Sequence, residues 1–358
     1  MISERVRSVI EAGSAYPLDV AAAPAEAVRL NANENPLGPP PGAVEAIRAT
    51  APDCWRYPEA VDQPLREAIA ASVGVDPSRV RLTNGSDELL ELVCTALFDP
   101  GDRVVIPTPT FGVYELAARL NGLEPTAVEL DAPAFDWSSV DLPGALASAD
   151  GAFVCRPNNP TGTGPAREAV AELLETGKPV VLDEAYVEFE GDSLAGWTTS
   201  YDNLVVARTF SKFYGLAGVR VGYAVAAPEV VETLGVVRSP YSVNRPAQAA
   251  ARAALADEAY PERVRRHVRT ERDRLRGALE DLGMTVVPSA TNFLMASTDP
   301  LGLDAASLVA DLEAEGILLR DLAGHRGLDG TWVRVTVGRA SENDRFITAL
   351  RELVSSNR

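Results

Sequence analysis

The sequence predicts an α/β fold in which a mostly parallel sheet lies between two layers of helices, together with a smaller α+β domain. Short valine-rich runs recur along the first two thirds of the chain, helical segments separate them, and the pattern changes near residue 246. Strands that are apolar at successive positions are typical of parallel sheets covered on both faces. Their alternation with helices favours an open α/β sheet.

The elements of the larger part follow from these patterns in chain order. A proline-rich loop over 36–42 leads into it. A helix over 86–97 is expected to begin at Ser86 or Asp87, since both residue types cap helices well, and another helix is expected over 166–176. The expected strands are Val104–Ile106, Ala152–Cys155, Val180–Leu182, Leu204–Ala207 and Val221–Val225.

The C-terminal part has a different character. A long helical stretch, 247–282, is dense in Arg and Glu. It is followed by strand-like TNFLMAS (291–297), a helix over 304–315, the segment ILLRDL (317–322), the alternating and so half-buried strand TWVRVTVG (331–338), and a last helix over 341–355. We therefore expect three parts: an N-terminal segment (1–35) that packs with the small domain, a large domain (36–245) and a small α+β domain (246–358).

Composition excludes several classes of protein. With 33 Lys and Arg against 51 Asp and Glu among 358 residues, the net charge of −18 repels nucleic-acid phosphates and anionic lipid surfaces. The sequence contains no run of about 18 apolar residues, so no membrane-spanning helix is expected. The charges near the N-terminus leave no room for the apolar stretch of a signal peptide. Three scattered cysteines and two histidines form no metal-ligand pattern. We expect a cytoplasmic protein with no metal, nucleic-acid or membrane partner.

Lysine is the scarcest charged residue, because only Lys178 and Lys212 occur among the 33 basic residues. A position that has stayed lysine in so arginine-rich a chain is a candidate for chemistry that needs an amine. Lys178 precedes Pro179 and is expected to be solvated.

Polar loops follow three of the expected strands, at the edge where ligands bind in such sheets. They are RPNNPTG (156–162), DEAY (183–186) and RTFSKFYGLAGVR (208–220). Pyridoxal phosphate uses such a set, because a lysine amine forms an imine with it and a carboxylate keeps its ring nitrogen protonated. Its phosphate needs a helix N-terminus, hydroxyls and an arginine. The loop 84–87 opens a helix, and Ser211 and Arg220 flank Lys212.

The block TFSKFYGLAGVRVGY (209–223) resembles the lysine signature of the histidinol-phosphate branch of the class I/II aminotransferases, which are fold type I pyridoxal-phosphate enzymes. Other blocks resemble that branch in the same order along nearly the whole chain. They are LNANENPLGP (30–39), RYPE (56–59), GSDE (85–88), PNNPTG (157–162), VVLDEAY (180–186), PYSVN (240–244), TNF (291–293) and VRVTVG (333–338).

The resemblance implies a role for each matching residue. Lys212 is the Schiff-base lysine and proton shuttle, Asp183 pairs with the pyridinium nitrogen, and Tyr186 contacts the ring hydroxyl with Asn159. Phe111 stacks on the ring where many relatives have Tyr, and Tyr57 reaches the phosphate of the neighbouring subunit in a homodimer with composite sites. The residues implied around the phosphate are Gly85, Ser86, Asp87 through its backbone N–H, Thr209, Ser211 and Arg220.

The matching residues define the substrate less closely than they define the cofactor. The resemblance implies that Arg334 binds the acidic group of the substrate, and Arg320 matches a common family arginine. Arg339 departs from the family pattern and adds a cation, while Tyr16 and Asn33 complete the expected substrate contacts. These residues allow histidinol phosphate, which with 2-oxoglutarate and glutamate is the leading expectation, as in histidine biosynthesis. They equally allow an aromatic or other amino acid, and a decarboxylase or oxidase on the same scaffold. A degenerate binding module is disfavoured by the intact set of Lys212, Asp183 and Arg220.

Overall fold

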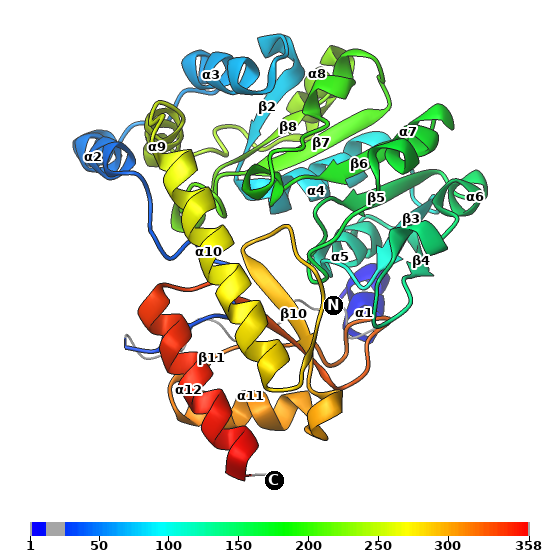
Figure 1. Cartoon of the computed structure of the whole chain (residues 1–358). Helices are drawn as coiled ribbons and strands as arrows, with labels where there is room; N and C mark the ends of the chain where they lie inside the picture. The colour runs from blue at the N-terminus through cyan, green and yellow to red at the C-terminus, as the bar shows by residue number, and fades with distance from the viewer. Residues whose placement is uncertain (1, 12–25, 357–358) are drawn as a thin grey trace.

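The computed structural model describes residues 2–11 and 26–356, and its main feature is a seven-stranded sheet (Figure 1). The strands lie in the order β2-β8-β7-β6-β5-β3-β4, and β8 is antiparallel to both of its neighbours whereas the other pairs are parallel. The mostly parallel α/β sheet expected from the sequence is therefore confirmed. Its strands are β2 (Val80–Thr83), β3 (Arg103–Thr108), β4 (Glu124–Glu129), β5 (Gly151–Cys155), β6 (Val180–Asp183), β7 (Leu204–Thr209) and β8 (Gly222–Val225).

Both faces of this sheet are buried, which explains the uninterrupted apolar runs. Along β5, Ala152 and Val154 join one hydrophobic cluster, while Phe153 and Cys155 join the other. Successive side chains point to opposite faces of a strand, so each face requires its own apolar cover. The first cluster is covered by α3 (Gln63–Val73), α6 (Leu142–Ala147), α7 (Arg167–Glu175) and α9 (Arg245–Leu255), and the second by α4 (Gly85–Leu97), α5 (Val113–Leu120) and α8 (Pro228–Val237).

A second, four-stranded antiparallel sheet lies on the C-terminal side, in the order β12-β13-β10-β9. Leu279, Phe346 and Val335 belong to its hydrophobic cluster, so two long helices pack on it. The strand expected over 331–338 is buried along its whole core rather than on one face, which corrects that expectation. The elements are β9 (Thr285–Val286), β10 (Phe293–Ser297), β12 (Arg320–Asp321), β13 (Trp332–Thr336), α10 (Tyr260–Asp281), α11 (Ala305–Ala314) and α12 (Ala340–Ser356).

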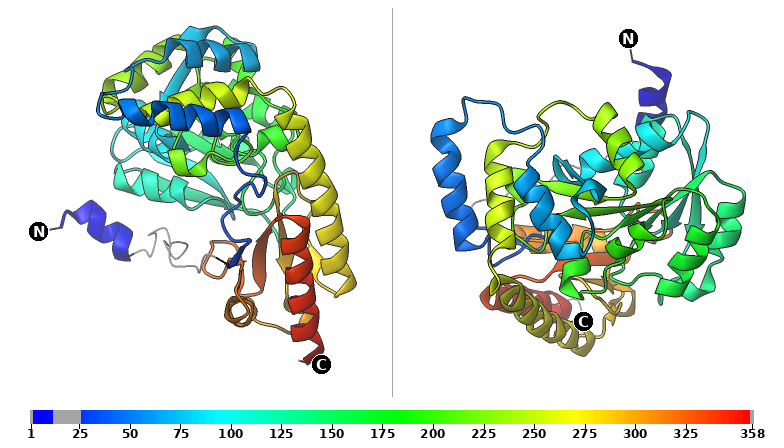
Figure 2. Two further views of the ribbon diagram at one scale, coloured as in Figure 1. Left: turned by 90° about the vertical axis from the view of Figure 1, so that its left-hand side faces the viewer. Right: turned by 90° about the horizontal axis from the view of Figure 1, so that it is seen from above.

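The N-terminal residues reach both parts of the molecule. Strand β1 (Val28–Arg29) pairs in parallel with β11 (Ile317–Leu318) beside the small sheet, and α1 (Glu4–Glu11) contacts α5 of the large part. Helices α2 (Pro41–Thr50) and α9 lie side by side (Figure 2).

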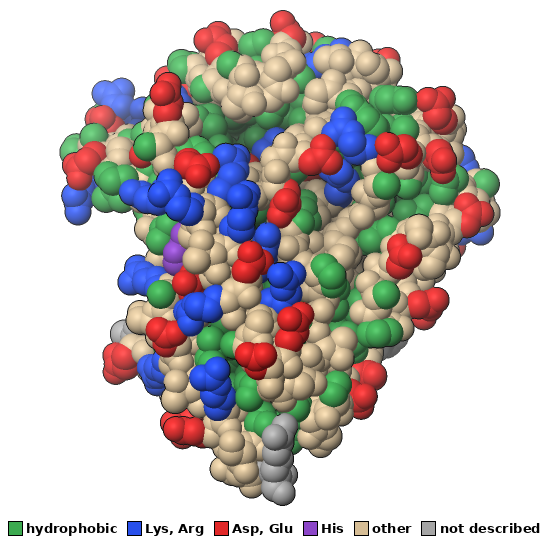
Figure 3. All heavy atoms as spheres, viewed as in Figure 1, with side chains coloured by type: hydrophobic (Ala, Val, Ile, Leu, Met, Phe, Trp, Pro, Cys, Tyr) green, Lys and Arg blue, Asp and Glu red, His purple; other side chains and the backbone are tan. Residues whose placement is uncertain are grey.

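The expected helix over 247–282 is wrong as a single element, because the chain breaks it into α9 and α10. The Asp257 carboxylate accepts hydrogen bonds from the N–H groups of Ala259 and Tyr260, and Pro261 is the second residue of α10. Since α9 packs on α2 and α3, we propose that the boundary between the large and small domains lies after α9 rather than at 245/246. Helix α10 carries seven arginines, and basic side chains gather along it on the surface (Figure 3).

Candidate active site

The site lies where the carboxyl ends of β5, β6 and β7 meet the small sheet and the segment 31–35. Asp183 is the last residue of β6, Asn159 follows β5, and Lys212 follows β7. Arg334 comes from β13 of the small sheet. The loops after three parallel strands thus converge at one edge, as the sequence predicted.

The amine of Lys212 is held by the backbone of the N-terminal segment. Its Nζ donates a hydrogen bond of 3.0 Å to the carbonyl oxygen of Ala32. Burial, and after it the nearby Arg334 guanidinium, lower the pKa of Lys212 to about 8. An amine of this kind is populated in its neutral form close to physiological pH, which a nucleophile and a proton shuttle both require.

Asp183 has a buried carboxyl group that accepts two hydrogen bonds. The Tyr114 hydroxyl donates to Oδ2 at 2.7 Å, and the N–H of Ala185 donates to Oδ1 at 2.9 Å. Burial raises the pKa of Asp183 to about 6, while both hydrogen bonds oppose that rise. A buried carboxylate with unused acceptor sites is suited to pair with a cationic ring nitrogen.

Tyr186, Asn159 and Arg334 are linked through the same N-terminal segment. The Asn33 side-chain amide donates to the Tyr186 hydroxyl at 2.9 Å, so the proton of that hydroxyl remains available for another acceptor. Arg334 donates to Asn159 Oδ1 at 2.5 Å and to the Asn31 carbonyl at 2.7 Å. Arg334 and Lys212 are therefore held by adjacent carbonyl groups.

A cradle for an anion lies at the N-terminus of α4. Gly85 has φ +78°, and a Cβ there would lie 2.6 Å from Nη2 of Arg220. A Cβ on Gly222 would lie 2.7 Å from the Gly85 carbonyl carbon and 2.8 Å from the Ser86 nitrogen. Only glycine at both positions lets the arginine and the helix N-terminus approach so closely.

The same cradle supplies donors of several kinds. Arg220 pairs with the Asp87 carboxylate at 2.8 Å, and the Thr209 and Ser211 hydroxyls lie 3.0 Å apart. Backbone N–H groups at a helix N-terminus, hydroxyls and a guanidinium together bind phosphate well. With Lys212 and Asp183 nearby on the same sheet edge, this donor set fits pyridoxal phosphate.

Other predicted residues lie around this centre in different ways. The Phe111 ring packs edge-on against Tyr114, with centroids 5.6 Å apart. Tyr57 is 78% exposed and stacks on Tyr241. Arg320 lies directly opposite Arg334 in the register of β12 and β13. Tyr16 lies outside the described residues.

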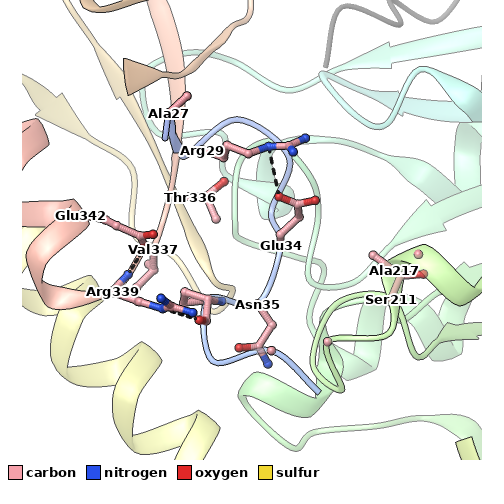
Figure 4. Close-up of a pocket in the computed structure, with 15 residues that line it drawn as sticks. Ala27, Arg29, Glu34, Asn35, Ser211, Ala217, Thr336, Val337, Arg339 and Glu342 are labelled. Carbon is pink, nitrogen blue, oxygen red and sulfur yellow. Dashed lines mark hydrogen bonds and ion pairs between the residues drawn. The ribbon is translucent and has the colours of Figure 1, made fainter. Parts of the chain in front are cut away.

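Arg339 takes part in a neighbouring cavity of about 380 Å³ (Figure 4). Its Nε donates to the Pro36 carbonyl at 2.8 Å. The cavity is also lined by Ser211, Arg29 and Glu34, of which the last two form an ion pair of 3.8 Å. The role of Arg339 in substrate binding stays a prediction.

Some residues of the site have roles that depend on contacts between distant parts of the chain, and no sequence pattern identifies them. Tyr114 was not singled out, although it lies one helical turn after Phe111. The Asn31 and Ala32 carbonyls, which hold Arg334 and Lys212, are backbone atoms and leave no signal in side-chain patterns. Within 2–11 and 26–356, no cluster of His, Cys, Asp and Glu could hold a metal ion. No helix in those ranges is long and apolar enough to cross a bilayer.

Several known proteins are similar to this chain in sequence. The family model "Aminotransferase class I and II" matches residues 25–350. A histidinol-phosphate aminotransferase of Symbiobacterium thermophilum is 44% identical over 334 residues, which cover 90% of each chain. Histidinol-phosphate aminotransferase 2 of Archaeoglobus fulgidus is 39% identical over 331 residues, covering 92% of this chain and 93% of that protein.

A solved structure shows the same fold. The histidinol-phosphate aminotransferase of Sinorhizobium meliloti, determined in complex with pyridoxal-5'-phosphate, superposes with a TM-score of 0.84 at 28% identity. The match covers 100% of this chain and 96% of that one.

Proposed function

The chain belongs to the class I and II aminotransferases, and from that premise we propose that it transfers the amino group of histidinol phosphate to 2-oxoglutarate. It is a pyridoxal-phosphate-dependent transaminase. The observation that carries the proposal is the placement of Lys212 and Arg334 on the adjacent carbonyls of Ala32 and Asn31. A reactive amine and an anion-binding cation therefore lie side by side, as a donor with an acidic group requires.

Pyridoxal 5'-phosphate, when bound, supplies an electron sink for the charge that remains when a proton leaves the carbon next to the substrate nitrogen. Lys212 supplies the amine that attaches covalently to the cofactor. With the cofactor bound, its Nζ would take the proton from that carbon and deliver it to the carbon on the other side of the nitrogen, because a pKa of about 8 allows both protonation states. The Ala32 carbonyl holds Nζ while it is protonated.

The remaining residues hold and orient the cofactor. Asp183 would hold the ring nitrogen and keep it protonated, because its carboxylate is a buried negative charge. Tyr186 donates its free proton toward the ring hydroxyl, since Asn33 already donates to the Tyr186 oxygen. Arg220, with the N-terminus of α4, binds the phosphate. These assignments agree with the hydrogen bonds and burial found at each residue.

The substrate's acidic group is assigned to Arg334 together with Arg320. Both side chains start from directly opposed positions on β12 and β13, so two cations can share one dianion. A phosphate gains more than a carboxylate from a second cation, and a guanidinium grips it through two parallel hydrogen bonds. This arrangement favours histidinol phosphate over a neutral aromatic amino acid.

The experiment that tests this proposal is a comparison of amino donors with 2-oxoglutarate as acceptor. We expect kcat/KM to be highest for histidinol phosphate and at least about a hundredfold lower for histidinol, because the cations would then lack a partner. Arg334→Lys should weaken the phosphorylated donor, whereas Arg326→Lys, at a surface position 51% exposed, should not. A higher kcat/KM for phenylalanine or tyrosine than for histidinol phosphate would overturn the substrate assignment.

We also propose a two-fold dimer in which Tyr57 serves the partner's site. Tyr57 is 78% exposed and stacks on Tyr241, which is 43% exposed, with ring centroids 4.8 Å apart, and Trp55, two residues before Tyr57, is 74% exposed. Large aromatic side chains that are exposed next to one another mark protein interfaces. The cytoplasmic location expected from the sequence stays a prediction.

Mixing inactive subunits tests the composite site. Tyr57→Phe and Lys212→Ala subunits should each be inactive as homodimers, whereas a mixed dimer contains one site with both residues intact. Random mixing should restore about a quarter of the wild-type activity. Tyr201→Phe, which removes a hydroxyl bonded to Glu175 at the surface, is the matched control and should remain active without mixing. Mixed dimers that form without activity would contradict the assignment of Tyr57.

A further inference from the structure

Tyr114 contacts the site through Asp183, to which its hydroxyl donates a hydrogen bond. It stands in the first turn of α5 and is only 1% exposed. Its ring is fixed between Phe111, at 5.6 Å and edge-on, and Phe153, at 6.0 Å and stacked. The ring packing leaves the hydroxyl aimed at Oδ2 of Asp183, 2.7 Å away.

Tyr114 is the one side chain, among those that the structure describes, that donates a hydrogen bond to Asp183. The other donor is the backbone N–H of Ala185, on Oδ1. A carboxylate has about four acceptor sites, so the two donors fix its plane and leave sites for a third partner. The orientation of the carboxylate is thus set from α5 and from its own loop.

The charges around Asp183 make this donor important. Burial works against the ionised carboxyl and is the largest influence on its pKa, which it raises to about 6. Asp87 opposes ionisation as well, and Lys212 favours it. Cys155 and Tyr186 also face the group and are themselves uncharged near neutral pH, because burial raises the pKa of both. The hydrogen bond from Tyr114 is the strongest of the influences that favour the carboxylate.

We propose that Tyr114 is a positioning residue for transamination, whose hydroxyl holds Asp183 as an oriented carboxylate so that the shared proton stays on the cofactor's ring nitrogen. The inference rests on the role of Asp183 in the proposed function. Without the hydroxyl, the carboxylate becomes more basic and draws that proton toward itself. The neutral ring nitrogen is a weaker electron sink.

The test is the Tyr114→Phe variant of the holoenzyme, loaded with pyridoxal phosphate that carries ¹⁵N in the ring. Phenylalanine keeps the packing against Phe111 and Phe153 and removes only the donor. We expect the ¹⁵N resonance to move toward the position of an unprotonated ring nitrogen, and turnover to fall about tenfold or more, since hydrogen bonds to charged groups are worth that much. An unchanged resonance in Tyr114→Phe would overturn the proposal, whatever happens to turnover.

Two further variants separate this role from general damage. Tyr223→Phe removes another buried tyrosine hydroxyl, on β8, and should leave both the resonance and turnover unchanged. In an Asp183→Asn background, Tyr114→Phe should have no further effect on turnover, because its partner charge is gone. Additive losses would mean that Tyr114 acts independently of Asp183. A wild-type protein that binds no cofactor at Lys212 would instead refute the proposed function itself.

Discussion

The chain contains two lysines, and their surroundings are opposite. The Nζ of Lys178 donates to three carbonyl oxygens at the end of α6, those of Leu146 (2.9 Å), Ala147 (2.9 Å) and Ala149 (2.6 Å). The Nζ of Lys212 donates to the single carbonyl of Ala32. The expectation that Lys178 is merely solvated is wrong, since it caps the carbonyl end of a helix, where a cation is favourable.

A scarce residue type indicates which positions are candidates for a special role. The hydrogen-bond partners of each lysine then decide what that role is. An ammonium has three protons, and Lys178 uses all three in hydrogen bonds. Its amine is held as a structural cation. Burial lowers the pKa of Lys212 to about 8, so its amine can give up a proton and react.

The largest expected difference between the two lysines is in activity. Lys212→Ala should reduce transamination by about 10⁴-fold or more, because the covalent attachment and the proton shuttle disappear together. Lys212→Arg should fail equally, since a guanidinium stays protonated. Lys178→Met is the matched control and should retain wild-type kcat when measured as a folded protein. Substantial activity in Lys212→Ala would mean that another group does this chemistry.

The next largest effect is expected at Asp183, the last residue of β6. Asp183→Asn keeps the shape and removes the charge, and kcat should fall at least about a hundredfold, or roughly 2.7 kcal/mol of transition-state stabilisation. Asp136→Asn, at an exposed carboxylate that accepts from the Ser138 N–H, should leave kcat unchanged. Near-normal turnover in Asp183→Asn would show that a different carboxylate faces the ring nitrogen.

The smallest expected effect is on the free energy of unfolding, which substitutions of the two lysines should change in opposite directions. In cofactor-free protein near pH 7, Lys178→Met should lower the free energy of unfolding by about 1–2 kcal/mol, because three carbonyls lose their donor. Lys212→Met should raise it by about 1–3 kcal/mol, because a partly buried charge is removed.

The pH dependence of that gain follows from the lowered pKa. The folded protein binds the Lys212 proton less tightly than the unfolded chain, so the charged amine costs stability below pH 8. The cost fades as the pH rises from about 8 toward the ordinary lysine value of 10.5. The advantage of Lys212→Met should fade over the same range in urea unfolding at several pH values. Changes of the same sign for both lysine variants near pH 7 would contradict the contrast.

Much of the fold could be predicted from the sequence because its signals are local. The apolar runs at 152–155, 180–182 and 204–207 became β5, β6 and β7, since strands buried on both faces need apolar side chains throughout. Helix α4 begins at Gly85, just before the Ser86 or Asp87 expected to cap it, and Asn84 takes the cap position. The helix break before Tyr260 is not evident from the sequence, because the arginine-rich pattern continues across it and Pro261, in the first turn of α10, is a weak local signal.

The candidate site was predicted only as far as its side chains could be matched to motifs. Each predicted strand-end residue could be placed by chain order, because the carboxyl ends of parallel strands share an edge. The contact between Tyr114 and Asp183 spans 69 residues, and the carbonyls of Asn31 and Ala32 meet side chains from β13 and the β7 loop. No local pattern encodes such pairings, because the first arises when α5 packs on the large sheet and the others when the segment 31–35 packs between that sheet and the small one.

The most direct test of the account is to find which lysine carries the cofactor. Purified protein loaded with pyridoxal phosphate should be yellow, and borohydride should fix the pyridoxyl group to the protein irreversibly. Peptide mapping by mass spectrometry should then place that group on Lys212 alone, with Lys178 unmodified. A pyridoxyl group on Lys178, or on neither lysine, would contradict the account.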